Sequence, residues 1–317
     1  MGAGASPQRR RVPAAKPKTP LAEQVEDAAG VESVAPGTQG ARTVRAQILL
    51  DRAHFSPGEI DGRYGNDLAI AIKGFQDAHH MKVTGTIDPD TWKLLNQDGA
   101  PLIDTYTITA ADVKGPFLPV PAENSEQAKM KFLGFESAAE ALGEKFHCSP
   151  KLLADLNPGK DLTEAGTEIQ VPALVRPAVA RAVRVVVSKS KRTVTAYGAG
   201  DKVLAQYPAT MGGPHDPLPR GKWIIANVEP MPWFNYDPVH FWNASRTAEA
   251  VRMPPGPNNP AGTVWMGLSK PHYGIHGTPD PGHIRHGESA GCIRLTNWDA
   301  MALSRMVRRG TPALLEE

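Results

Sequence analysis

The spacing of hydrophobic residues changes once along this chain, and that change limits the folds open to it. Before residue 100 the apolar side chains recur at helical spacing, whereas after about residue 181 they alternate as in a β-strand. The residues that show this are Val44, Ile48, Leu49, Leu68, Ile72 and Phe75 in the first part and Val183, Val185 and Val187 in the second. We therefore expect a multidomain α+β protein in which helical modules precede a mostly β domain.

The length and charge of the chain further limit the class of protein to which it can belong. The chain has 317 residues, enough for two or three domains of about 150 residues each. Its 35 basic and 33 acidic side chains leave a net charge of +2, which offers no strong field for nucleic acid. No apolar run reaches the length of about 18 residues that a membrane span needs, so we expect no transmembrane segment.

Residues 1–40 are rich in Ala, Pro, Gly and charge and show no sustained period, so we predict a disordered N-terminal arm. The arm has the basic stretch Arg9-Arg10-Arg11 but no apolar stretch after it. A signal peptide is therefore not present in this sequence.

Residues 41–100 are expected to form a small three-helix bundle. Two helices flank a tight loop over residues 56–65, and a third begins after Asp88, an N-cap carboxylate followed by Pro89. The motif Gly58-x-Ile60-Asp61-Gly62-x-Tyr64-Gly65, with Phe75-Gln76, Thr84-Gly85-x-Ile87-Asp88 and Thr91-Trp92, resembles the peptidoglycan-binding domain of cell-wall enzymes. The resemblance implies peptidoglycan as a partner.

Residues 101–172 are predicted to run strand, helix, helix, strand. A strand at Tyr106 to Ile108 is followed by helices from Ser137 to Phe146 and from Ser149 to Leu156, and a strand ends at Pro172. This order, with the Leu153-x-x-Leu156-Asn157-Pro158 motif, is similar to lysin-motif domains, which bind N-acetylated glycans. A polar insertion around residues 123–131 departs from the compact form of that family.

Residues 173–180 read as a Pro/Ala linker, and residues 181–317 as a mostly β domain of the β-sandwich type with long Pro/Gly-rich loops. A short helix is expected from Met301 to Arg308 near its end.

The densest group of reactive side chains lies in this last domain. Cys292 follows His276 by sixteen positions, and a histidine near a cysteine can take its proton and so activate it as a nucleophile. Backbone N–H groups at Gly291 and Cys292 could face the oxyanion of an acyl intermediate. The other cysteine, Cys148, is expected to be a buried small hydrophobe.

Two other interpretations of this group stay open at the level of residue types. Cys292 could be a core cysteine beside a strand. A zinc site is the second, since the group mixes plausible ligands. Its candidate ligands are His272, His276, His283, His286 and Cys292.

The order of these residues is similar to the catalytic domain of L,D-transpeptidases. The motif His276-Gly277-Thr278 precedes the motif Ser289-Ala290-Gly291-Cys292-Ile293-Arg294, and twelve residues lie between His276 and Ser289. Many relatives have histidine where this chain has Ala290. The resemblance implies that Cys292 is the nucleophile, that His276 is the general base and acid, and that the Gly277 carbonyl orients His276. It further implies loop-shaping roles for Ser289, Gly291 and Arg294, and substrate contacts for Tyr273 and Thr278.

The implied reaction is cleavage of a peptidoglycan tetrapeptide stem before its terminal D-alanine through a thioester, with transfer to an amine that forms a 3-3 cross-link. No metal or organic cofactor is implied. The acceptor is left open between another stem and a wall-anchored protein, and an L,D-carboxypeptidase or a non-catalytic peptidoglycan-binding scaffold are the alternatives. A substrate of this kind implies export to the bacterial cell envelope, in the periplasm.

Overall fold

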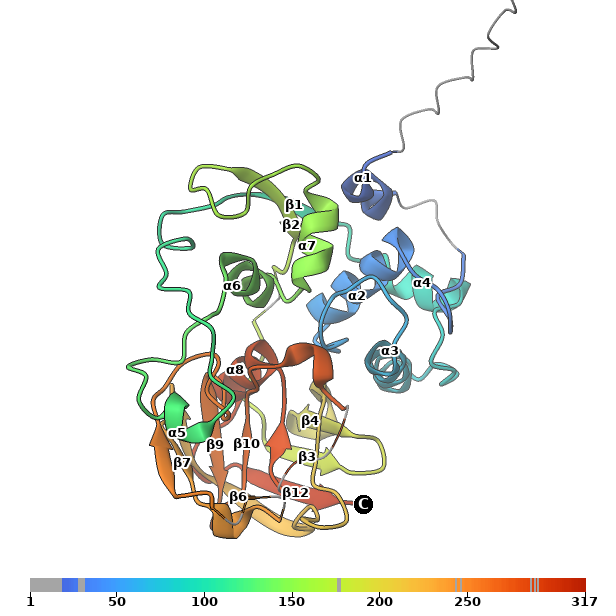
Figure 1. The fold of residues 1–317 in the computed structure, drawn as a ribbon. Helices are drawn as coiled ribbons and strands as arrows, with labels where there is room; N and C mark the ends of the chain where they lie inside the picture. Colours follow the sequence, from blue (N-terminus) through green and yellow to red (C-terminus); the bar gives the residue numbers. More distant parts are fainter. Residues whose placement is uncertain are drawn as a thin grey trace, which may run out of the picture.

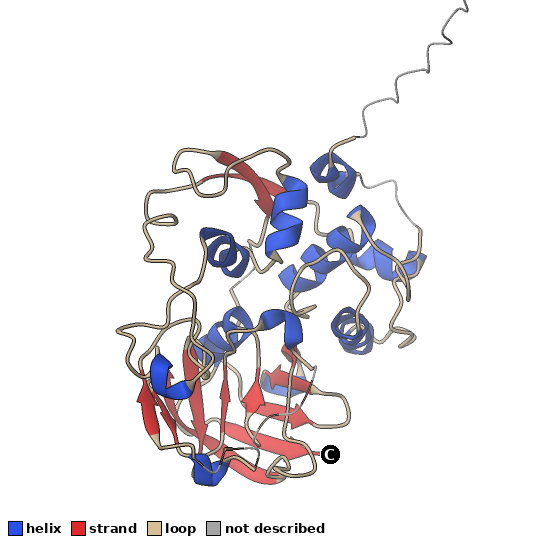
Figure 2. Cartoon of the chain, in the orientation of Figure 1, coloured by secondary structure: helices blue, strands red, loops and turns tan. Residues whose placement is uncertain are grey.

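The computed structural model of the chain describes residues 19–27, 32–175, 178–242, 244–245, 247–285, 287, 289 and 291–317. Most of the helices lie at one end of the molecule and a large sheet at the other, with α8 (Asn297–Met306) between them and the short helix α5 (Asn124–Gln127) beside the sheet (Figure 1 and Figure 2). We call residues 41–100 the first module, residues 101–172 the second module and residues 181–317 the C-terminal domain. Among the described residues no helix is both long and apolar enough to cross a lipid bilayer.

The first module contains the three predicted helices, α2 (Ala41–Arg52), α3 (Asn66–Ala78) and α4 (Pro89–Leu95). The predicted start of α4 is confirmed, because the Asp88 carboxylate accepts a hydrogen bond of 2.8 Å from the Thr91 N–H. Ile48, Ile72 and Trp92 are at most 1% exposed and form the centre of the bundle. The apolar residues that recur at helical spacing in the sequence are therefore the ones that pack between the helices.

The prediction of a disordered arm was wrong for the residues of it that the structure describes. Residues 21–26 form α1 (Leu21–Glu26), whose Val25 is 0% exposed, and Val34 pairs with Ile87. Residues 1–18 and 28–31 lie outside the described part. Short charged helices lack a visible period, so tertiary contacts and not local pattern order this segment.

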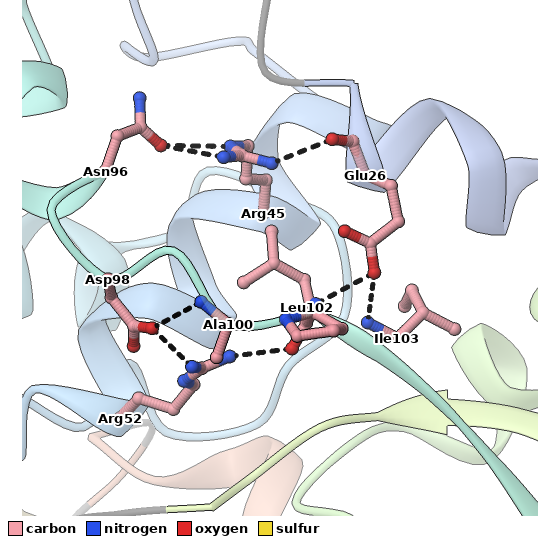
Figure 3. Close-up of polar contacts among 9 residues, drawn as sticks. Glu26, Arg45, Arg52, Asn96, Asp98, Ala100, Leu102 and Ile103 are labelled. Atoms are coloured by element: carbon pink, nitrogen blue, oxygen red, sulfur yellow. Dashed lines mark hydrogen bonds and ion pairs between the residues drawn. The ribbon is translucent and has the colours of Figure 1, made fainter.

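Polar contacts fasten α1 to its neighbours (Figure 3). The Glu26 carboxylate accepts hydrogen bonds of 2.8 Å from the N–H groups of both Leu102 and Ile103. The Arg45 guanidinium donates to the carbonyl oxygen of Glu26 and to the side-chain oxygen of Asn96. Through these contacts α1, α2, the end of α4 and the start of the second module meet at one point.

The second module has the predicted element order. β1 (Ile103–Thr107) pairs antiparallel with β2 (Glu168–Pro172), and α6 (Ala138–Lys145) and α7 (Pro150–Leu156) lie between them in the chain. Ser137 and Ser149 cap the two helices. The insertion between β1 and α6 carries a short helix, α5 (Asn124–Gln127). One continuous hydrophobic core runs through both modules, from Val25 to Val171.

The C-terminal domain is built on one eight-stranded sheet in the order β11-β10-β9-β6-β12-β3-β4-β5, with a separate ribbon of β7 and β8. The strands are β3 (Arg184–Ser188), β4 (Thr193–Tyr197), β5 (Val203–Pro208), β6 (Gly221–Pro230), β7 (Phe234–Tyr236), β8 (Val251–Met253), β9 (Val264–Leu268), β10 (Gly274–His276), β11 (Ile293–Arg294) and β12 (Pro312–Glu316). The described residues of this domain also form three short 3-10 helices: η1 (Ala199–Asp201), η2 (Pro238–His240) and η3 (Pro281–His283).

This sheet corrects the predicted sandwich of two separate sheets. Residues 221–224 of β6 pair with β12, whereas residues 225–230 pair with β9, and the register shifts between Ile225 and Asn227. A strand that passes through such an irregularity bends and takes part in both halves, so the sheet curls without breaking in two. The curled sheet and the helix α8 share a single hydrophobic core.

Two further differences lie near the chain end. The predicted helix from Met301 to Arg308 begins earlier, at Asn297, because the Thr296 hydroxyl accepts a hydrogen bond from the Asp299 N–H and so caps α8. The last strand, β12, was not predicted, although it pairs parallel with β3 in the middle of the sheet.

The first module covers the outer edge of the sheet. Phe55 forms a parallel bridge with Gln206 of the edge strand β5, and the Ser56 N–H donates a hydrogen bond of 2.9 Å to the Gln206 carbonyl. Nearby, the Ser56 hydroxyl donates to the Asp299 carboxylate of α8 at 2.7 Å. The loop after α2 thus continues the sheet by one short segment.

Candidate active site

The end of the sheet at β9, β10 and β11 brings His276 and Cys292 together. β10 and β11 are parallel neighbours with His276 opposite Arg294, and β9 is antiparallel to β10 with Trp265 opposite His276. Cys292 directly precedes β11, and it lines the same cavity as His276 and Arg294. The imidazole and the thiol therefore face the same cavity.

Both side chains line a cavity of about 440 Å³. Aromatic side chains from the loop after β6, from β7 and from the residue after η2 form an aromatic wall of this cavity: Trp233, Phe234, Tyr236 and Phe241. Asn124 of α5 also lines the cavity, so the insertion of the second module reaches the C-terminal domain here. Besides His276 and Cys292, the residues that line this cavity include Asn124, Trp233, Phe241, Trp265, His272 and Arg294.

His276 is held in one tautomer. Its side chain is buried, and its Nδ1 lies 2.7 Å from the carbonyl oxygen of Gly277, which can only accept a hydrogen bond. The proton of the neutral ring is therefore on Nδ1, and Nε2 is the basic nitrogen. The Trp265 ring stacks on the imidazole with centroids 5.3 Å apart.

Burial and the nearby charge of Arg294 lower the pKa of His276 to about 3, against the opposing hydrogen bond to Gly277. Burial raises the pKa of the Cys292 thiol above its usual range, although the Gly274 backbone and Arg294 act in the other direction. The Cys292 Sγ lies 3.6 Å from the His272 carbonyl oxygen, to which the thiol donates. Both shifts favour a neutral thiol and a neutral imidazole at neutral pH.

The turn before Cys292 depends on Gly291. Its φ is +82°, a left-handed conformation that residues with a Cβ disfavour. A Cβ at this position would stand 2.6 Å from the Tyr273 ring. The Ser289 hydroxyl donates to the Cys292 carbonyl, and the Ser289 N–H donates to the Met211 carbonyl at 3.2 Å. These contacts fix the direction in which Cys292 leaves the turn.

Arg294 and the segment around Thr210 hold the same turn from its other side. The backbones of Thr210 and Arg294 exchange two hydrogen bonds, of 3.0 and 2.9 Å. Arg294 lines the cavity, so its charge lies beside the thiol and the imidazole. The predicted loop residues therefore surround Cys292.

The two predicted substrate contacts lie at different places. The Tyr273 ring packs against Gly291, beneath the turn, and has Lys270 Nζ 5.2 Å from its centroid. Thr278 is buried, and it lines a neighbouring cavity of about 470 Å³ that shares Arg294 and Pro260 with the first.

The candidate zinc ligands do not form one cluster in the described part of the chain. His283 is exposed and pairs with Asp280 at 2.8 Å, whereas His276 is buried against Gly277. Among described residues no three His, Cys, Asp or Glu side chains come together as a metal site. His286 lies outside the described residues, and so does Ala290.

Sequence reasoning missed the aromatic wall of the cavity. The stretch from Met231 to Trp242 holds five aromatic residues between prolines and polar residues, and this density was a usable signal for a binding surface. Asn124 gave no such signal, because nothing in a polar insertion tells which distant domain it will touch.

Comparison with known proteins agrees with this site. Residues 182–315 match the family model for the L,D-transpeptidase catalytic domain, and residues 39–95 match the model described as "Putative peptidoglycan binding domain". The chain is 31% identical over 174 residues to "Putative L,D-transpeptidase YkuD" of Bacillus licheniformis, a match over 54% of this chain and 89% of that protein. The protein of the same name in Bacillus subtilis is 29% identical over 172 residues, covering 54% of this chain and 88% of the relative.

Among solved structures, the L,D-transpeptidase of Xylanimonas cellulosilytica, residues 123–326, is similar to this chain. It has a TM-score of 0.39 and 16% identity, with 95% of this chain and 100% of that chain covered.

A buried imidazole and a cysteine on adjacent strand ends, above a cavity, define an acyl-transferring enzyme of the cysteine-nucleophile class. The chain belongs to the L,D-transpeptidase family and carries a peptidoglycan-binding domain in front of its catalytic domain. The lysin-motif character of the second module stays a prediction.

Proposed function

We propose that this protein is an L,D-transpeptidase that forms 3-3 cross-links in peptidoglycan, with Cys292 as its nucleophile. The observation that carries the proposal is the contact of 2.7 Å between His276 Nδ1 and the Gly277 carbonyl, in a cavity shared with Cys292. This contact leaves Nε2 as the base and takes the place that a carboxylate has in other triads.

In the first half-reaction His276 Nε2 takes the thiol proton as Cys292 Sγ attacks the carbonyl carbon of the third residue of the stem. The new C–S bond forms, the amide C–N bond breaks, and the leaving D-alanine nitrogen takes the proton back from His276. Because the pKa of the imidazole is lowered and that of the thiol is raised, we propose that proton transfer accompanies attack instead of preceding it.

Backbone N–H groups of Gly291 and Cys292 are the proposed donors to the oxyanion, because both belong to the turn that carries the thiol and Gly291 has a left-handed φ of +82° there. Ser289 and Arg294 hold the turn, and Gly277 orients His276. Tyr273 supports the turn from beneath, and Thr278 belongs to the neighbouring cavity. In that cavity we place the acceptor side of the substrate.

In the second half-reaction an amine of a neighbouring stem, or of a wall-anchored protein, attacks the thioester and gives up a proton through His276, and Cys292 is regenerated. Water in the same position would give an L,D-carboxypeptidase. The peptidoglycan-binding domain supports a location in the cell envelope, and we propose that the protein works in the periplasm, with glycan binding by the second module as an added anchor.

The deciding experiment incubates the protein with disaccharide-tetrapeptide muropeptides and follows the products by mass spectrometry. Dimers that lack one D-alanine are expected with the native protein. They should be absent with Cys292→Ala and with His276→Gln, while Cys148→Ala serves as the matched cysteine control and should keep activity. Tripeptide monomers with free D-alanine would establish hydrolysis instead. If the protein changes neither the muropeptides nor intact sacculi, it would be a non-catalytic peptidoglycan-binding scaffold.

A further inference from the structure

Two exposed tryptophans lie on the segment that forms the aromatic wall of the catalytic cavity: Trp233 lines the cavity, and Trp242 lies outside its lining. Trp233 is 45% exposed and Trp242 is 59% exposed, at the two ends of the stretch that contains β7 and η2. Between them, Phe234, Tyr236 and Phe241 line the cavity itself. The same segment therefore connects the site of the thiol with the outer surface.

Each exposed ring is held by a partner on one face. The Arg252 guanidinium carbon lies 4.4 Å from the centroid of the Trp233 ring. The His215 ring stacks on Trp242, with centroids 4.3 Å apart and planes at 24°. A ring that is covered on one face and about half exposed presents its other face to solvent without needing to be ordered on binding.

The surroundings of these rings favour a sugar over a protein as their ligand. A peptide stem in the cavity would hold its own glycan strand close to the segment that carries both rings, so sugar is the chemical group brought nearest to them. Flat aromatic faces carry negative charge, and they attract the polarised C–H groups on one side of a pyranose ring. Two isolated, rigid rings with polar neighbours match that mode of contact.

We propose that Trp233 and Trp242 bind the N-acetylated sugar rings of the glycan strand from which the peptide stem enters the cavity. The inference rests on the proposed function, because it is the stem in the cavity that fixes the nearby glycan. It gives the C-terminal domain a glycan-binding surface of its own, separate from the first and second modules.

The test compares two substrates, the disaccharide-tetrapeptide and the same tetrapeptide without sugar. For Trp242→Ala we expect the ratio of kcat/KM for the first substrate to that for the second to fall by about two- to tenfold, as for the loss of one aromatic contact. Trp242→Phe, which keeps a flat ring, should restore most of the ratio. Phe132→Ala is the control, because Phe132 is similarly exposed, at 49%, and does not line the catalytic cavity.

An unchanged ratio in Trp242→Ala would overturn the proposal, and a loss confined to a protein acceptor would assign the rings to a protein surface instead. If the native protein turns over neither substrate, the proposed function fails while the glycan surface remains testable. Calorimetric titration of peptide-free strands of N-acetylglucosamine and N-acetylmuramic acid would then decide. Weaker binding by Trp242→Ala than by Phe132→Ala supports the surface, and equal binding overturns it.

Discussion

Arg285 and Asp67 join the first module to the loop that separates His276 from Cys292. The guanidinium Nη1 of Arg285 lies 3.0 Å from the Asp67 carboxylate at the start of α3, and the two side chains are only 14% and 22% exposed. Arg285 itself has a left-handed φ of +66°. The loop between base and nucleophile is therefore held from outside the C-terminal domain.

This ion pair should contribute measurably to stability. A double-mutant cycle with Asp67→Asn and Arg285→Gln is expected to give a coupling energy of about 1 kcal/mol in denaturant unfolding, because the pair is partly shielded from water. The pair between Arg184 and Asp201 is the matched control, since Asp201 is 79% exposed, and it should give close to none. Equal coupling in the two cycles would contradict a special role for the Arg285 contact.

The reactivity of Cys292 should rise with pH. Burial raises the pKa of its thiol and lowers that of His276, so no preformed thiolate–imidazolium pair is expected. The rate of alkylation by iodoacetamide, located by mass spectrometry, should increase steadily from pH 6 to pH 9. Cys148 is 1% exposed and should remain unlabelled in the native protein. A plateau of fast labelling at acidic pH would show an ion pair and refute the neutral state.

Gly291 is required for two structural reasons, its left-handed φ and its close contact with the Tyr273 ring, and substitutions can separate them. Gly291→Ala would combine a left-handed φ with a contact of 2.6 Å to the Tyr273 ring, whereas Gly287→Ala, at φ +90°, would meet open space. We expect both variants to lose about 1–2 kcal/mol of unfolding free energy. Only Gly291→Ala should also lose most of its kcat, because Cys292 follows it directly. Removing the ring with Tyr273→Ala in the same chain should restore part of that activity; no restoration would place the fault elsewhere.

The pH dependence of stability should contain a contribution from Glu144. Burial raises the pKa of this carboxyl to about 8, even though its oxygen accepts a hydrogen bond of 3.0 Å from Asn297. The folded protein thus holds a proton that the unfolded chain releases near pH 4.5, so this contribution is full below pH 4.5 and is lost as pH rises toward 8.

The Glu144→Gln side chain keeps an oxygen that can accept the hydrogen bond from Asn297, but this side chain cannot ionise. At pH 8 this variant should be more stable than the native protein by roughly 1–3 kcal/mol, and the difference should shrink at pH 5. Unfolding in urea at the two pH values measures it, with the exposed Glu164→Gln as the control. A difference independent of pH would rule out titration of Glu144 as its cause.

Asn124 should affect substrate binding more than chemistry. It comes from the second module and lines the cavity beside the aromatic wall, where its amide can hydrogen-bond a peptide group. Loss of one such hydrogen bond in Asn124→Ala should raise KM about three- to tenfold with little change in kcat. Ser125→Ala, next along the chain, should behave as native; a fall in kcat alone for Asn124→Ala would contradict a binding role.

Local signals in the sequence were sufficient for the caps and for the reactive group. Asp88, Ser137 and Ser149 cap helices where their spacing predicted, and Cys292 and His276 line one cavity as their motif required. Such features depend on a few neighbouring residues, and for that reason they can be read from the chain alone.

Features that depend on distant partners could not be read in this way. The bend of the sheet is set by an irregularity in β6 between two different pairing strands, and neither partner is visible from the sequence of β6. The order of residues 21–26 likewise comes from Arg45 and from the start of β1, far along the chain. The Asn124 contact with the cavity is of the same kind.

The bridge between Phe55 and Gln206 has a consequence for how such a protein can be divided or recombined. Without the first module, β5 would be left as a bare outer strand with unpaired N–H and C=O groups, a surface that natural sheets hide because other chains add to it. The catalytic domain is thus not an independent unit that can be joined to any other domain. Truncation near residue 181 would remove the segment that pairs with β5, and any domain fused there in its place would have to cover that edge strand.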